Sequence, residues 1–541
     1  MMTLNDIDTT DKTKFRLIGK SVLAYRFIVP HDAGLFVGDI IKIEDETKKY
    51  TFFAKVTDLF HESNFADQNW DTRPYSEQFY GLGEDVFIGV EAVPLGFIDE
   101  ANIFRKPRTV PVKFSRVSIP GAEDFDFLKK VMGDIEVGVI RTGQEDLKGV
   151  PVKIPSAVLP QHMGVFATTG MGKSNFMRVF CASSMKARLF GLLIVDPHGE
   201  YVRGGKSSTG ETSKGLPHYS AGKEGLAIFS IDKTNQKKYG ANQLWLEYDD
   251  FRMGDLSLLY ELSPAQSEAI EALEEFSGSK TIAFFLSVED IESLPDQVKD
   301  GTYRGIYPEI ADRLKSFHPS TLQSIQRKVK IIAHGNERFF RSKGSAIQEI
   351  INALHDHKVV LIDIPRMSER SELFILSMIT RHILHEHRKT AEEFGIEDES
   401  AEQHQILIAI DEAQRVLASG GSSTQVFREC AMEGRKFGVG LCVITQQPKN
   451  VDPKVLAQIN TFIIMGLGDR GDRDIVMSSA KQDLSRMEVE IQTLDRGETI
   501  ISTLSIPFPV STRIHKFEEY LTVLNAEKKE DIRDGLSNGF S

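Results

Sequence analysis

The spacing of apolar residues changes near residue 150 and divides the chain into two parts. Before that point, short apolar runs alternate with Gly and Asp turns, as in FRLIGKSVLAYRF, LFVGDIIKIED, YTFFAKVTDLF and DVFIGVEAVPLGFI. Alternating or β-branched runs of this kind, separated by turn residues, indicate strands. Several such strands within about a hundred residues predict a small β-barrel at residues 1–118. Residues 119–150 are expected to form a linker and the entry to the next domain.

After residue 150, buried-type strands alternate with helical segments. Met163–Thr168 and Leu192–Val195 are apolar runs, and the stretch from Ser174 to Met185 between them has a helical pattern. Strands that alternate with helices predict a parallel sheet of the α/β class. Further buried strands are expected at VVLIDI, ILIAI, GLCVIT and TFIIM. The predicted second domain covers residues 151–525, with a mostly helical insertion at about 254–350 and a tail at 526–541.

Composition limits the function classes without selecting one. The 541 residues carry 65 Lys and Arg against 78 Asp and Glu, and a net charge of −13 excludes a globally basic nucleic-acid binder. A local basic surface on an acidic body stays open. Three cysteines are too few for a disulfide framework or a four-Cys zinc site. No run approaches the roughly 20 apolar residues of a membrane helix, and no secretory signal begins the chain, so we expect a cytoplasmic protein without membrane contact.

A glycine-containing loop between the first strand and the first helix of the second domain predicts a phosphate-binding site. The loop reads ATTGMGKSN from Ala167, and small residues allow backbone N–H groups to turn toward phosphates. Lys173 would reach the β- and γ-phosphates, and the Ser174 hydroxyl would ligate Mg²⁺. Ala167 replaces the usual first Gly, which matters only if this position requires a positive φ. The expected nucleotide-binding residues are Thr169, Gly170, Met171, Gly172, Lys173, Ser174 and Asn175.

Two other strands end in carboxylates. The apolar run ILIAI leads into Asp411 and Glu412, which predicts an Mg²⁺ ligand followed by a general base or water-orienting residue. Strands that leave a protein core commonly end in acidic residues, so this run alone is weak evidence for a catalytic site. The phosphate loop elsewhere in the same domain makes the catalytic interpretation stronger. The second strand leads into Asp196 and the sequence DPHGEY, which adds Glu200 to the candidate catalytic residues. Pro, Gly and Asp there also suit a plain surface turn.

Two polar groups near a later strand complete the candidate site. Gln446 follows the strand GLCVIT, where an amide could sense the γ-phosphate, although a simple turn is the alternative. Arg435 lies just before this strand and could act as an arginine finger in a neighbouring subunit, or be a solvated turn residue. The chain has no Asn-Lys-x-Asp sequence for reading guanine, which favours ATP over GTP. Without CxxC or HExxH spacing, a separate catalytic metal site is not expected.

Basic residues gather in two segments. Residues 105–116 contain five bases and no acid, and residues 313–343 contain eight bases and one acid, Glu337. Either segment could contact DNA phosphates in a salt-dependent manner, or could be a solvated linker or helix face. The bases of the second segment are Arg313, Lys315, Arg327, Lys328, Lys330, Arg338, Arg341 and Lys343. No base-reading module is present, so DNA binding is expected to be largely independent of sequence.

Taken together, these motifs resemble the HerA family of hexameric DNA-translocating ATPases, within the HerA–FtsK group of P-loop motors. The similarity runs in order through ATTGMGKSN, LLIVDPHGEY, ILIAIDEAQRVL, EGRKFGVGLCVITQQPKNVDPKVLAQINTFIIMGL and IPFPVSTRIHKF. The resemblance implies a RecA-like fold, a six-membered ring on duplex DNA, and ATP sites between subunits where Arg435 acts in trans. It also implies a partner, either a nuclease or a defence effector. The family also has an N-terminal β-barrel, and residues 1–118 resemble it only in their strand-rich pattern.

The main hypothesis is therefore an ATP-driven DNA translocase or helicase that uses ATP and Mg²⁺ as a homo-hexameric ring. One rival is a nucleotide-gated ring scaffold that organises and activates an effector without moving along DNA, because a scaffold can retain every ATPase residue. A second rival moves protein or packages DNA at a membrane, and the lack of an apolar anchor makes it less favoured. In a ring, an acidic exterior and a basic channel are both compatible with the negative total charge.

Overall fold

The computed structural model describes residues 15–30, 32–63, 86–205, 213–335, 340–341, 343–394, 404–418 and 425–538. These residues form two compact units through which the chain passes alternately. Unit 1 comprises Met1–Pro155, Phe166–Phe176 and Asn460–His515, and unit 2 comprises Ser156–Val165, Met177–Ile459 and Lys516–Ser541. This division differs from the predicted domain ranges, because unit 1 joins the N-terminal residues to strands from near the C-terminus.

The first part of unit 1 is an antiparallel sheet that is nearly closed. Its strand order is β1 (Phe15–Arg16), β7 (Arg116–Ser118), β3 (Ile40–Asp45), β4 (Tyr50–Ser63), β5 (Val86–Ile98) and β2 (Tyr25–Pro30), with β6 (Phe104–Arg105) paired to β5. A bridge between Leu17 and Phe27 connects the two ends of this order. The arrangement is compatible with the predicted small barrel.

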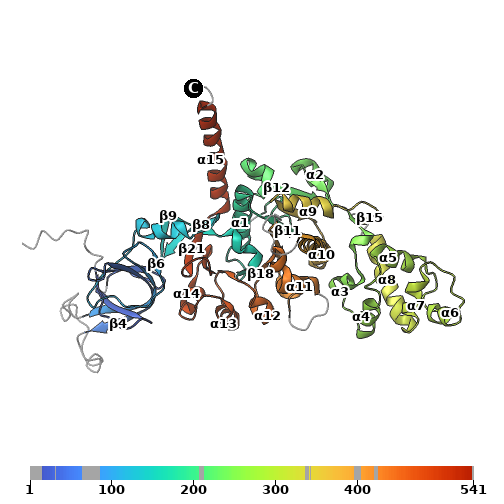
Figure 1. Ribbon diagram of the computed structural model, residues 1–541, viewed down its shortest axis with the longest axis horizontal. Coiled ribbons are helices and arrows are strands. Elements are labelled where there is room, and N and C mark those ends of the chain that lie inside the picture. Colours follow the sequence, from blue (N-terminus) through green and yellow to red (C-terminus); the bar gives the residue numbers. More distant parts are fainter. Residues whose placement is uncertain are drawn as a thin grey trace, which may run out of the picture. The chain divides into compact units, whose positions relative to one another are not determined.

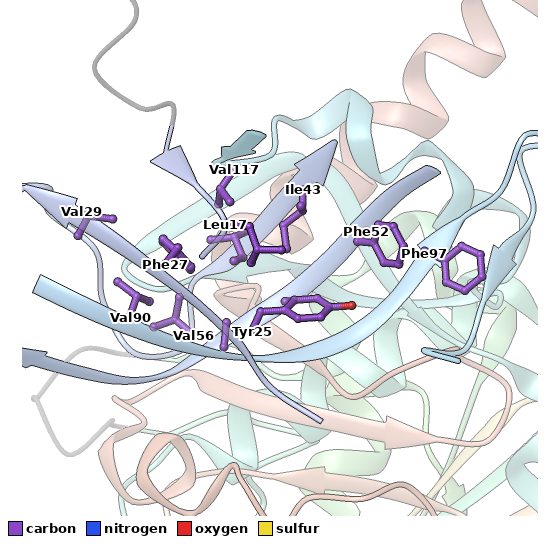
Figure 2. Close-up of a cluster of buried hydrophobic side chains, with 13 residues drawn as sticks. Leu17, Tyr25, Phe27, Val29, Ile43, Phe52, Val56, Val90, Phe97 and Val117 are labelled. Atoms are coloured by element: carbon purple, nitrogen blue, oxygen red, sulfur yellow. The ribbon is translucent and has the colours of Figure 1, made fainter. Parts of the chain in front are cut away.

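The interior of this sheet is apolar and aromatic. Figure 2 shows the side chains of Tyr25, Phe27, Phe52 and Val90 among those that gather inside it. Along β2, buried and partly exposed residues alternate, as the period of two in a strand requires. Phe52 and Phe97 lie with their ring centroids 5.2 Å apart, a favourable separation for aromatic pairs. The alternating pattern read from the sequence therefore corresponds to an inward apolar face.

The rest of unit 1 is a second set of antiparallel strands. Their order is β19 (Thr461–Ile464), β20 (Glu498–Thr503), β21 (Val510–Ile514), β8 (Ile135–Thr142) and β9 (Glu145–Ile154). The helices of this part are η4 (Ala122–Lys130), α13 (Arg470–Ser479) and α14 (Glu488–Thr493). The segment 119–150, which we expected to be a linker and entry, thus contains η4, β8 and the first residues of β9.

A buried cluster of charged side chains links three elements of unit 1. Lys55 Nζ on β4 lies 2.7 Å from Glu490 Oε2 on α14, and Arg141 Nη2 on β8 lies 3.0 Å from Glu490 Oε1. All three side chains are at most 7% exposed. Burial lowers the pKa of Lys55, and the Glu490 carboxylate opposes this shift. The N-terminal sheet is therefore joined to the later strands of unit 1 by a fully desolvated ion triad.

The core of unit 2 is a parallel sheet with helices packed on it. The strand order is β13 (Asn242–Gln243), β12 (Leu226–Ser230), β16 (Val359–Asp363), β11 (Gly191–Asp196), β17 (Ile406–Ile410), β18 (Val439–Thr445) and β10 (Met163–Phe166), of which residues 163–165 belong to unit 2. Helices α9 (Ile347–His355), α10 (Glu369–Phe394) and α11 (Gln425–Glu433) pack against these strands. The α/β class predicted from the sequence is confirmed.

The predicted helical insertion forms a group of helices in unit 2 (Figure 1). It contains α3 (Leu256–Leu259), α4 (Pro264–Glu271), α5 (Gly278–Ser287), α6 (Leu294–Lys299), α7 (Pro308–Leu314) and α8 (Pro319–Gly335). Two short parallel strands, β14 (Leu246–Glu247) and β15 (Phe340–Arg341), pair at its ends. The Ala346 amide also donates to the Trp245 carbonyl at 2.7 Å, so the chain leaves and re-enters the sheet part at one place.

The remaining α-helices of the described residues are α1 (Lys173–Ala187), α2 (Lys233–Tyr239), α12 (Pro453–Leu456) and α15 (Phe517–Asn538). Helix α1 begins in unit 1 and continues in unit 2. A search of the described ranges finds no helix with both the length and the apolar character needed to cross a bilayer. Cys181, Cys430 and Cys442 are free thiols buried in unit 2.

Substituting Glu490 tests the importance of the buried triad. The Glu490→Gln variant removes the carboxylate that Lys55 and Arg141 share and leaves Arg141 only the more distant Glu498, 3.7 Å away, so it should lower the free energy of unfolding by about 3–5 kcal/mol. Urea denaturation followed by circular dichroism measures the change. Asp126→Asn is the matched control, because Asp126 pairs with Lys129 at the surface of the same unit and should cost less than about 1 kcal/mol. Equal urea midpoints for Glu490→Gln and wild type would contradict the assignment.

Candidate functional site

The predicted phosphate loop is a strand-to-helix turn that requires glycine at two positions. It connects β10 to α1, and α1 begins at Lys173. Gly170 has φ +88° and Gly172 has φ +106°, a conformation that residues with a Cβ rarely adopt. A Cβ at Gly170 would meet no atom within 4 Å, so the backbone conformation and not crowding demands glycine there. The first N–H groups of the following helix form a natural anion site.

Three strand ends of unit 1 hold this loop in place. The Thr168 amide donates to the Gly466 carbonyl after β19 at 3.2 Å, and the Gly497 amide before β20 donates to the Met171 carbonyl at 3.0 Å. At the start of α1, Asn175 Nδ2 donates to the His515 carbonyl after β21 at 2.8 Å. The loop is thus fixed at its first residue, its tip and its helical end. Asn175, predicted as a nucleotide contact, serves here as one of these anchors.

The replacement of the first loop glycine by Ala167 is accommodated. Ala167 is fully buried, and its φ is not positive, in contrast to Gly170 and Gly172. The methyl group therefore packs in the core without backbone strain. The departure from the usual loop pattern has no structural cost at this position.

In unit 2, the residues after β17 and β18 lie together. Glu412 accepts a hydrogen bond from Gln446 Nε2 at 2.8 Å on one carboxylate oxygen and from Gln414 Nε2 at 2.6 Å on the other. The Glu412 amide donates to Asp411 Oδ1 at 2.9 Å. Because β17 and β18 are parallel neighbours, their carboxyl ends share one edge of the sheet. The structure thus brings together the predicted Asp411, Glu412 and Gln446.

Sequence reasoning missed two residues of this cluster. Gln414 stands two residues after Glu412, and Thr445 Oγ1 donates to Gln414 Oε1 at 2.6 Å. Thr445 therefore fixes the orientation of the Gln414 amide, which in turn fixes the Glu412 carboxylate. Glu412 itself has φ +48°, a strained conformation for a residue with a long side chain. Both residues could have been found from the sequence, because each is an amide or hydroxyl residue close to a predicted site residue: Gln414 near Glu412, and Thr445 before Gln446.

The DPHGEY segment after β11 is a turn organised by Asp196. The Asp196 carboxylate accepts hydrogen bonds from the amides of Glu200, Tyr201 and Val202 at 2.9–3.0 Å. Burial raises the pKa of Asp196 to about 6, and the three backbone hydrogen bonds oppose this shift. The Glu200 side chain is exposed and has no hydrogen bond or ion pair with any residue in the described ranges. The turn therefore fixes the backbone of Glu200 through Asp196, while the Glu200 side chain is exposed.

Arg435 occupies an exposed turn of unit 2. It lies in η11 (Gly434–Phe437), directly before β18, and its side chain is exposed. Its guanidinium has no hydrogen bond or ion pair among the residues that the structure describes. The turn is closed by a hydrogen bond from the Gly438 amide to the Arg435 carbonyl at 3.3 Å. An exposed arginine on a short, closed turn is available to a neighbouring molecule, as a finger residue would be.

His162 is a buried residue near this turn that sequence reasoning missed. It lies just before β10 with φ +65°, and its Nδ1 accepts from the Leu441 amide on β18 at 2.9 Å. Burial lowers the pKa of His162 to about 4, against an opposing hydrogen bond with the Ala431 backbone, and the charge of Arg435 lowers it further. The imidazole is therefore neutral at physiological pH and joins β18 to the segment before the phosphate loop.

The strand-loop-helix turn and the carboxylates at the edge of a parallel sheet define a P-loop nucleoside triphosphatase. The family model described as "Helicase HerA, central domain" matches residues 135–383. The predicted resemblance to the HerA family is therefore confirmed over these residues. The predicted enzyme class, a helicase-type ATPase, is confirmed with it.

Curated relatives match most of the chain. The chain is 25% identical to the DNA double-strand break repair helicase HerA of Pyrococcus furiosus, over 84% of this chain and 82% of the relative. The protein of the same name from Saccharolobus solfataricus is 22% identical, over 90% of each chain. Among solved structures, the bacterial conjugative coupling protein TrwB matches with 13% identity and a TM-score of 0.44, over 73% of this chain and 93% of TrwB.

The burial of His162 predicts a pH dependence of stability. The pKa of His162 in the folded protein, about 4, lies below the unfolded value of 6.5. The neutral imidazole therefore makes its full contribution to the free energy of unfolding above pH 6.5. The contribution is lost as the pH falls from 6.5 to 4, by up to about 3 kcal/mol. Urea denaturation of wild type and His162→Asn at pH 7.5 and pH 4.5 measures it. The destabilisation caused by the substitution should shrink at the lower pH, and an equal destabilisation at both values would refute the titration.

Proposed function

We propose that the protein is an ATP-driven motor that moves on duplex DNA as a homo-hexameric ring together with a nuclease or other effector partner. The proposal rests on one observation: Gln446 and Gln414 each donate a hydrogen bond to a different oxygen of the Glu412 carboxylate, at an edge of the sheet. This arrangement orients a carboxylate for work on water, in a chain that also has a phosphate loop. The names of the curated HerA relatives support DNA as the substrate.

The phosphate loop suits ATP and Mg²⁺. Gly170 and Gly172 give the loop the positive φ angles that turn backbone N–H groups toward an anion, and α1 adds the positive end of its dipole. Lys173 would neutralise charge on the phosphates. The Ser174 hydroxyl and the Asp411 carboxylate are oxygen ligands of the kind that Mg²⁺ prefers. When bound, MgATP supplies the phosphoryl group and the hydrolysis energy, and Thr169 and Met171 complete the loop around it.

Glu412 would orient and deprotonate the attacking water. Its two oxygens accept from Gln446 and Gln414, so the carboxylate is held in one plane and retains lone pairs for a water molecule. Gln446 would exchange its bond to Glu412 for one to the γ-phosphate and so report which nucleotide is present. Thr445 keeps Gln414 on Glu412 during this exchange. Glu200, whose side chain is exposed, is a further candidate catalytic carboxylate.

The ring would complete the site with Arg435 from the next subunit. The exposed η11 turn presents this guanidinium outward, where it can stabilise the charge that develops on the transferred phosphoryl group. An arginine supplied in trans couples hydrolysis to the arrangement of neighbouring subunits. Contacts to DNA would be made mainly to phosphates and so be largely independent of sequence.

Glu412→Gln should separate nucleotide binding from turnover. The variant replaces the carboxylate by an amide of the same shape and so loses the general base. We expect kcat to fall by about 10²–10⁴-fold, with the KM for ATP nearly unchanged. Steady-state ATPase assays with and without duplex DNA measure both constants. Lys173→Ala is the companion variant and should lose nucleotide binding itself. Turnover near the wild-type value in Glu412→Gln would show that this carboxylate is not the base.

The motor and the scaffold are separated by measuring movement. Wild-type protein with DNA-stimulated ATPase activity should displace a strand or a triplex-forming oligonucleotide from duplex DNA. ATP hydrolysis without displacement would favour the nucleotide-gated scaffold. The mass of the particle in solution with ATP tests the ring on which the role of Arg435 depends.

A further inference from the structure

The basic segment 313–343 separates into paired and unpaired cations in the structure. On α7, Arg313 lies 2.5 Å from Glu275, and Lys315 just after this helix lies 2.7 Å from Asp312. Arg338 lies outside the described residues. The bases of α8 are different, because α8 contains no Asp or Glu at all. Three of the eight bases of this segment therefore lie on a helix without acids, while Arg341 and Lys343 are exposed beyond it.

One face of α8 presents cations to solvent. Gln323, Arg327, Lys330, Ile331 and His334 fall on the same side of a helix by their spacing. Arg327 and His334 are exposed, Lys330 is half-buried and Ile331 is 51% exposed. Within the described ranges, neither Arg327 nor Lys330 pairs with an acid. These residues line a shallow hollow with a volume of about 610 Å³.

The opposite face of α8 fixes how the cations are presented. Leu322, Ile325 and Val329 are buried against the other helices of the insertion. Gln326 Nε2 donates to the carbonyls of Phe285 at 2.9 Å and Val288 at 2.6 Å, at the end of α5. These bonds set the rotation of α8 about its axis. Gln326 also lines the hollow, so these bonds fix the helix backbone from which the cations extend.

The neighbouring polar groups leave this charge uncompensated. Lys328 points elsewhere, with its Nζ donating to Gln266 at 3.2 Å and Ser324 at 3.1 Å. Burial lowers the pKa of Lys328, and the charge of Arg327 lowers it further. Glu292 accepts a hydrogen bond from Gln323 Nε2 at 2.6 Å. Within the described ranges, neither the exposed Arg327 nor the half-buried Lys330 forms an ion pair with Glu292 or with another acid.

We infer that the α8 face formed by Gln323, Arg327, Lys330, Ile331 and His334 contacts the sugar–phosphate backbone of duplex DNA. The inference rests on the proposed motor function and names the surface that would hold its substrate. In a chain of net charge −13, an acid-free face with two unpaired cations is complementary to a polyanion. Arg327 and His334 are separated by about 10 Å along the helix, which spans several phosphates of one strand.

The test is the salt dependence of DNA binding by the full-length protein. Arg327→Glu combined with Lys330→Glu should weaken binding to a labelled random-sequence duplex. It should also flatten the plot of log K against log salt by about 0.9 for each lost phosphate contact. Fluorescence anisotropy from about 50 to 200 mM NaCl measures the affinity where the electrostatic contribution of phosphate contacts changes strongly with salt. Arg327→Lys keeps the charge and should restore most of the affinity.

The matched control reverses the same number of charges on paired residues of the same insertion. Arg313→Glu with Lys315→Glu should leave the salt slope as in wild type, because these side chains already pair with Glu275 and Asp312. Thermal unfolding checks that all variants are folded. An unchanged slope in the α8 variant, with wild type binding DNA, would overturn the α8 contact and leave the motor function standing. Failure of wild type to bind duplex DNA at any salt would instead overturn the proposed function.

Discussion

The buried triad of Lys55, Glu490 and Arg141 is the interaction on which unit 1 depends. Desolvating three charges is costly, and the cost is offset only when each charge meets its counter-ion at short distance. Glu490 provides this for both cations and also accepts from Ser511 Oγ at 2.5 Å. A carboxylate on α14 thus pairs with a strand of the N-terminal sheet and with β8, and connects these three elements directly.

The same network reaches the phosphate loop through the backbone. Arg141 Nε lies 3.7 Å from Glu498 Oε1, and Glu498 also holds Arg513 at 2.7 Å. The residue before Glu498, Gly497, donates its amide to the loop carbonyl of Met171. The loop therefore rests on strands whose positions are set by buried charges. A rigid support of this kind pre-organises an anion site, which is the usual source of electrostatic stabilisation in phosphoryl transfer.

Local patterns predicted the sheet and the core of the candidate site well. The phosphate loop is contiguous in the chain, and Glu412 and Gln446 were expected together because parallel strands share an edge. The supporting residues were missed, because a local pattern does not show which neighbouring side chain orients which. Gln414, Thr445 and His162 act through side-chain orientation, and the Lys55–Glu490 pair joins positions more than four hundred residues apart. Glu200 is the opposite case: its motif was recognised in the sequence, and its side chain is exposed in the structure.

The pairing of β14 with β15 has an evolutionary consequence. The helical insertion leaves and returns through neighbouring backbone hydrogen bonds, with Leu246 opposite Phe340 and Glu247 opposite Arg341. Because both ends are fixed at one place, the helices between them can be lengthened, shortened or exchanged without altering the sheet, and closing a longer loop costs little extra entropy. The insertion is in this sense a replaceable cassette. Relatives could diversify the surface they offer to a substrate there while the hydrolytic machinery stays the same.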